Sequence, residues 1–215
     1  MKKKIALLLL ACVMAFGIAV GGTLAWLVDS TEEVKNTFTV GDINIDLKEH
    51  DYVLETNTLD TAVETTANAD YHFVPGDTLP KDPFVKVQEG SEDCYLFIKV
   101  VESGNIEVTG TDADGQSVTE KALKYAVDTA EWTAVPDHTG YWYKIVTDVP
   151  AEINGDYQTY NILANQQVKV SEYVTKDSAM ETAKPTISFW AAAVQKDHVA
   201  DVAAAWAKLP TSFTA

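Results

Sequence analysis

The chain lacks arginine entirely and has only two cysteines among its 215 residues. Because Cys12 lies in an apolar N-terminal run, Cys94 would remain alone after removal of that run. This excludes an intramolecular disulfide and a CxxC redox site. The HExxH motif of zinc proteases and the GxSxG motif of serine hydrolases are also missing. The motifs of these enzyme classes therefore identify no catalytic residue in this sequence.

Positive charge is scarce as well. The 16 lysines face 32 aspartates and glutamates, which gives a formal net charge of −16. Residues 1–25 contain three lysines and no acidic side chain, so 13 lysines against 32 acids leave −19 in the rest. A surface this acidic repels nucleic acid and anionic lipid. Since 47% of the residues are hydrophobic, we expect a folded domain without a nucleic-acid partner.

Residues 1–25 have the organisation of a signal peptide. Lys2–Lys4 form a charged region, residues 5–20 are apolar, and Thr23-Leu24-Ala25 supplies small residues for a cleavage site. The apolar run is shorter than the roughly 20 residues that a membrane-spanning helix needs. We therefore expect cleavage between Ala25 and Trp26, export of the remainder, and no stable membrane span after cleavage.

Several short motifs follow this segment. They are Gly21-Gly22-Thr23-Leu24-Ala25, Trp26-Leu27-Val28-Asp29, Asn36-Thr37-Phe38 with Gly41-Asp42-Ile43, Pro75-Gly76-Asp77, and Ala193-Val194-Gln195 with Ala205-Trp206. In combination they resemble the TasA/CalY (camelysin) family. The N-terminal motifs carry most of the resemblance, and the later ones agree with it.

The resemblance implies a secreted protein of a Gram-positive bacterium, located at the cell surface or in the biofilm matrix. It implies processing by a SipW-type signal peptidase and a jelly-roll β-sandwich. It also implies assembly into extracellular fibres, in which each subunit donates its mature N-terminal strand to the next one. Camelysin itself is described as a metallopeptidase, so the resemblance raises that activity too.

The pattern of residues 38–215 independently predicts an all-β domain, because short runs rich in threonine and valine alternate with turn residues. Strands are expected at 38–47, 52–54, 72–74, 84–87, 94–101, 106–108, 117–119, 123–127, 131–135, 141–147, 161–170 and 186–195. The predicted fold is an antiparallel jelly-roll-like sandwich.

Two segments depart from this strand pattern. Residues 55–70 are acidic and rich in threonine, and they predict a long loop with little to bury. Residues 199–209 carry apolar side chains at helical spacing and predict a short C-terminal helix. Asp197 is its expected N-cap, and Pro210 is expected to end it.

The segment 26–37 is the strongest functional candidate. Cleavage before Trp26 would leave the apolar residues Trp26, Leu27 and Val28 at the end of the mature chain. They can fold back onto their own sheet, or they can add to the open edge of a neighbour's sheet. In the second case Trp26 and Val28 would anchor the strand, and Phe38 would begin the donor's own core.

Other residue types give weaker signals for chemistry. The four histidines, His50, His72, His138 and His198, show no helical zinc-site spacing and are expected to be surface or capping residues. Cys94 lies in an apolar run and is expected to be a buried free thiol. We therefore predict no catalytic residue and no obligatory cofactor.

Two binding alternatives stay open. Asp112 and Asp114 resemble the start of a calcium loop, although a plain hairpin turn is the simpler reading, so any calcium binding would be weak. Tyr141-Trp142-Tyr143 could form an exposed platform for a glycan, as in a surface adhesin, whereas strand aromatics more often pack in a core. The preferred function is that of a fibre subunit, self-associating and contacting other matrix proteins, with the metallopeptidase and the adhesin as alternatives.

Overall fold

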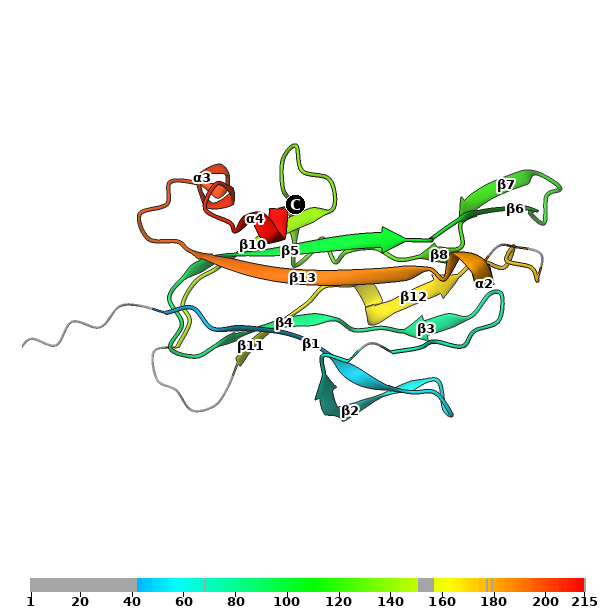
Figure 1. Cartoon of the computed structure of the whole chain (residues 1–215), viewed down its shortest axis with the longest axis horizontal. Helices are drawn as coiled ribbons and strands as arrows, with labels where there is room; N and C mark the ends of the chain where they lie inside the picture. Colours follow the sequence, from blue (N-terminus) through cyan, green and yellow to red (C-terminus); the bar gives the residue numbers. More distant parts are fainter. Residues whose placement is uncertain (1–41, 68, 151–156, 177, 179, 215) are drawn as a thin grey trace, which may run out of the picture. The chain divides into compact units, whose positions relative to one another are not determined.

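The computed structural model describes residues 42–67, 69–150, 157–176, 178 and 180–214, which belong to one compact unit, Gly41–Ala215 (Figure 1). The predicted signal peptide (1–25) and N-terminal extension (26–37) lie outside the described residues. The same holds for Ala25, Trp26, Leu27, Val28 and Phe38. Among the described residues, no helix is long and apolar enough to cross a membrane.

Antiparallel sheets dominate the domain, which confirms the predicted all-β sandwich. One sheet has the order β11-β4-β1-β2, and another has the order β13-β5-β10-β9. Their strands are β1 (Ile45–Val53), β2 (Thr58–Thr65), β4 (Phe84–Gln88), β5 (Cys94–Ser103), β9 (Thr133–Ala134), β10 (Tyr141–Val146), β11 (Tyr157–Asn161) and β13 (Thr186–Gln195). Among these described strands, only β1–β2 and β9–β10 pair as consecutive strands; the other neighbours are distant in sequence and are joined by long crossover connections.

Smaller elements extend these sheets. A short sheet has the order β3-β12-β8, and β6 and β7 form a hairpin. The bounds are β3 (Thr78–Pro80), β6 (Glu107–Thr111), β7 (Ser117–Lys121), β8 (Leu123–Lys124), β12 (Gln167–Val170), a 3-10 turn η1 (Ala164–Gln166), α2 (Met180–Ala183), α3 (Val202–Trp206) and α4 (Thr211–Thr214). The predicted hairpin around 112–115 and the predicted strand 186–195 are thereby confirmed.

The central strand β5 is buried on both faces. Leu96 and Ile98 point into the main core, which also contains Val85 and Val87 of β4. Tyr95 and Phe97 point the other way, where α3 and α4 cover the sheet. This double burial explains why β5 reads as a continuous apolar run rather than an alternating one.

The C-terminal helix is shorter than its pattern predicts. Asp201 is the N-cap of α3, since its side chain accepts a hydrogen bond from the Ala204 N–H at 2.8 Å. The predicted start at residue 199 and the predicted cap Asp197 are therefore wrong. The helix ends at Trp206 rather than at Pro210, and Pro210 instead precedes α4, which the sequence did not predict.

The predicted loop 55–70 is also wrong, because it contains β2. This strand pairs with β1 from Val53↔Thr58 to Glu49↔Thr65, with a register shift between His50 and Asp51. Most β2 side chains are exposed. Its backbone pairing with β1, rather than core burial, holds it in place, so composition alone gave little sign of it.

Candidate functional site: an open strand edge

Strand β13 has an unprotected edge. Its ten residues pair with β5 along their whole length, from Thr186↔Ser103 to Gln195↔Cys94. No other strand pairs with it among the described residues. Its sequence TISFWAAAVQ contains no charged residue and no proline. Natural proteins normally protect edge strands with lysine, proline or bulges, so a long uncharged edge is a strong candidate for strand addition.

Hydrogen bonding defines which backbone groups face this edge. The Lys196 N–H donates to the Asp93 carbonyl at 2.8 Å, and the register continues without a bulge into β13. Along an antiparallel ladder, residue pairs that exchange hydrogen bonds alternate with pairs that do not. The even-numbered residues of β13 therefore bond to β5, and the N–H and C=O groups of the odd-numbered residues 187–195 point away from it.

The first half of β1 has a second open edge. Residues Ile45–Lys48 pair with β4, but β2 pairs with β1 only from Glu49 onward. The Asn44 carbonyl accepts a hydrogen bond from the Gln88 N–H at 3.0 Å, so Asn44 faces β4. By alternation, the backbone groups of Ile45 and Leu47 face away from β4. Strands β1 and β13 contact each other (Figure 1).

Inward-facing side chains of these two strands form an apolar seam. All are only half-buried, and all pack against the main core: Ile43, Ile45, Leu47, Ile187, Phe189, Ala191 and Ala193. Their exposure means that the sandwich is incompletely covered where β1 meets β13. An added strand would therefore find apolar side chains as well as free backbone groups.

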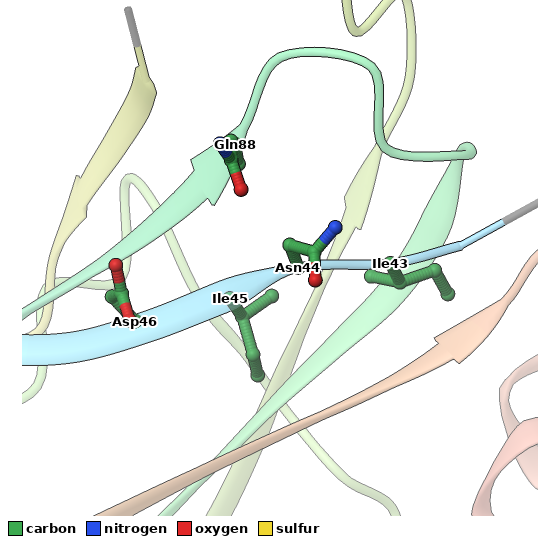
Figure 2. Close-up of a pocket in the computed structure, with 5 residues that line it drawn as sticks. All are labelled: Ile43, Asn44, Ile45, Asp46 and Gln88. Carbon is green, nitrogen blue, oxygen red and sulfur yellow. The ribbon is translucent and has the colours of Figure 1, made fainter. Parts of the chain in front are cut away.

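A shallow pocket lies where β1 begins, lined by Ile43, Asn44, Ile45, Asp46 and Gln88. Figure 2 shows the side chains of Ile45 and Asp46 on opposite sides of the strand. Asn44 is fixed here, because its N–H donates to Ser91 Oγ at 3.1 Å. The chain thus enters β1 in a defined extended conformation immediately after the segment that the structure does not describe.

Charged side chains surround the middle of β1. Lys81 Nζ lies 2.5 Å from Glu49 Oε2, and both side chains are about 15% exposed or less. His50 Nδ1 lies 2.6 Å from Asp82 Oδ2, and the His50 N–H donates to Asp82 Oδ1 at 3.1 Å. Asp82 is buried. Burial, followed by the nearby Glu49 and Asp82 carboxylates, raises the pKa of Tyr71 well above its usual value.

The histidines do not assemble a metal centre. His50 binds Asp82, and His138 stacks on Trp206 with ring centroids 4.0 Å apart. His72 and His198 are exposed. In the part of the chain that the structure describes, no three His, Cys, Asp or Glu side chains lie together in a way that could hold a metal ion. These residues do not fit the ligand set of a catalytic zinc.

Asp112 and Asp114 lie in the β6–β7 turn. Asp112 Oδ1 accepts hydrogen bonds from the Asp114 and Gln116 N–H groups at 3.0 and 2.8 Å. The Asp112 carboxylate thus closes the hairpin, as the plain-turn reading expects. Calcium binding by this pair stays a prediction.

Tyr141, Trp142 and Tyr143 do not form the glycan platform that the sequence left open as an alternative. Trp142 packs against the main core, whereas Tyr141 and Tyr143 pack on the opposite face beneath the C-terminal helices. Successive strand residues point to opposite faces, so three consecutive rings cannot form one surface. The same alternation separates Phe189, which contacts the core, from Trp190, which is 43% exposed.

Cys94 is a buried free thiol, as predicted. Burial, with a smaller contribution from Asp93, raises the pKa of this thiol to about 12. A thiol that stays protonated is a poor nucleophile, which argues against a catalytic role for Cys94.

The fold and its edges define the class of protein: an antiparallel β-sandwich with an unprotected edge strand, covered on one outer face by short C-terminal helices. The sequence model of a family described as camelysin metallo-endopeptidase matches residues 1–122, which is more than half of the chain. The chain belongs to this family. Neither the curated proteins nor the solved structures gave a match.

Proposed function

We propose that this chain is a secreted structural subunit of extracellular matrix fibres at a Gram-positive cell surface. In this proposal, residues 26–37 of one copy, freed by a SipW-type signal peptidase, add as a strand to the open edge of the next copy. The observation that carries the proposal is the uncharged ten-residue edge of β13.

The chemistry of the two partners is complementary. The odd-numbered residues of β13 offer free N–H and C=O groups, and the half-buried seam with β1 offers apolar contacts. The segment starting at Trp26-Leu27-Val28 would offer three consecutive apolar side chains to this edge. Backbone hydrogen bonds would supply affinity, and alternate side chains filling the seam would supply register.

This mode of addition produces a fibre rather than a closed oligomer. The donor segment and the receiving edge are different surfaces, so each added copy presents a fresh edge to the next one. The strongly acidic composition keeps separate copies apart at low ionic strength. Other matrix proteins with an exposed strand would be further partners of the same edge.

The test compares two versions of the mature protein. One covers residues 26–215 and begins with Trp26, and the other begins at Thr37. Both are incubated at the same high concentration and imaged by negative-stain electron microscopy. Fibres from the first version alone support strand donation. If both versions form identical fibres, or if the first stays monomeric in the presence of fibre seeds, the proposal is wrong.

The family description favours one alternative, a cell-surface metallo-endopeptidase. Its test is independent of assembly. The purified protein is dialysed with zinc, its bound metal is quantified, and cleavage of a casein substrate is measured in the wild type and in His50→Ala. Stoichiometric zinc with proteolysis that this substitution abolishes would establish the peptidase.

A further inference from the structure

The Lys81–Glu49 pair has the setting of a covalent cross-link. Glu49 lies in β1, where its backbone pairs with Thr65 of β2. Lys81 follows β3, and its N–H donates to the Gln166 carbonyl at 2.9 Å. Both backbones are thus fixed, and the two side chains meet with Nζ and Oε2 only 2.5 Å apart.

The pair is largely enclosed, and two aromatic rings lie beside the lysine. The exposed fractions of the Lys81 and Glu49 side chains are 14% and 15%. The Lys81 Nζ lies 5.4 Å from the centre of the Tyr71 ring and 5.7 Å from that of Phe189. Removing an ammonium and a carboxylate from water costs free energy that their mutual attraction only partly offsets. Condensation to an amide would remove both charges together and, with them, this cost.

Asp82 does not compete for the lysine. Both of its oxygens are engaged by His50, one by the backbone N–H and one by the ring Nδ1. Lys81 is thus directed toward Glu49, whose carboxyl carbon lies beside the amine. Groups held in this way react with effective molarities on the order of 10⁵–10⁸ M.

We propose that Lys81 and Glu49 condense to an intramolecular isopeptide bond. The ammonium gives one proton to the carboxylate, and the neutral Nζ attacks Cδ of Glu49. The C–N bond forms, the bond from Cδ to one oxygen breaks, and that oxygen leaves as water with the two protons that the nitrogen loses. One positive and one negative charge disappear together, and no oxidant or other reactant is needed.

The bond would act where a fibre needs strength. In a chain held through its N-terminal segment, tension would enter the domain at β1, the first strand that the structure describes after that segment. A link from Glu49 to Lys81 would stop β1 from peeling beyond residue 49. It would constrain the fold covalently, as a disulfide does in other proteins, since Cys94 is a free thiol among the described residues. The link itself does not depend on fibre assembly.

Trypsin and mass spectrometry test the bond directly. The purified full chain is denatured and digested. Without a link, cleavage after Lys48, Lys81 and Lys86 yields the separate peptides 49–81 and 82–86. With the link, Lys81 resists trypsin, and one peptide covering 49–86 appears, lighter than its sequence mass by one water. The side-chain link closes residues 49–81 into a ring. Cleavage of a single backbone bond inside this ring therefore releases no fragment ion.

The matched control is Lys81→Arg, which keeps the positive charge and the trypsin site but cannot condense in this way. It is expected to yield the two separate peptides. The proposal is overturned if the folded wild-type protein yields peptides 49–81 and 82–86 at unmodified mass, or a 49–86 peptide that retains the water. It is overturned as well if Lys81→Arg shows the same loss of water as the wild type.

Discussion

Replacing Ala193 by proline tests the open edge most directly. The Ala193 N–H points away from β5, so proline removes a donor at the edge without breaking a β5 hydrogen bond. One hydrogen bond contributes about 0.5–1.5 kcal/mol net. Each subunit added to a fibre would make this bond once. The critical concentration for assembly should therefore rise between about twofold and about tenfold.

The assay is sedimentation of mature protein at assembly equilibrium, followed by measurement of the monomer left in solution. Ala193→Ser is the matched control, because it keeps the N–H group and a small side chain. Near-ultraviolet circular dichroism checks that both variants remain folded. The reasoning is refuted if the folded proline variant has the same critical concentration as Ala193→Ser, because the β13 edge would then not receive a strand.

Three further predictions concern the stability of the domain. Trp132 is 1% exposed, and its Nε1–H donates to the Asn161 carbonyl at 2.7 Å, so Trp132→Phe should lower the free energy of unfolding in urea by about 1–3 kcal/mol. An unchanged urea midpoint would contradict the importance of this bond. Asp201→Ala should cost about 1 kcal/mol by the same assay, because it removes the cap of α3, whereas Asp201→Asn should retain most of the stability. The pKa of the buried Cys94 thiol is raised from 9.0 to about 12, so the unfolded chain ionises first as pH rises. Stability should therefore fall between pH 9 and pH 12, more steeply in the wild type than in Cys94→Ala, and equal slopes would refute this cause.

The sequence predicted the elements whose pattern is local. Strand 186–195 was expected with the bounds of β13, and the buried run beginning at Cys94 was expected as β5. The hairpin around 112–115 was evident from its Asp and Gly turn residues. Each of these segments carries its own propensity and turn signal, so no distant partner was needed to recognise it.

Elements that depend on distant partners were missed. The strand β2 has mostly exposed side chains and owes its conformation to pairing with β1. The N-cap of the C-terminal helix shifted from Asp197 to Asp201, because apolar spacing alone does not fix where a helix begins. The three-ring platform failed because period-two alternation places Trp142 inside the sandwich.

The sequence by itself determined the family motifs, the all-β class and the acidic composition, because these follow from composition and local pattern. Only the tertiary structure decided which strand lies at an edge, which backbone groups of β13 point outward, and that Lys81 meets Glu49. These features arise from pairings between segments far apart in the chain. A strand's own residues do not encode its neighbours, so the receiving edge and the Lys81–Glu49 pair became visible only in the assembled sandwich.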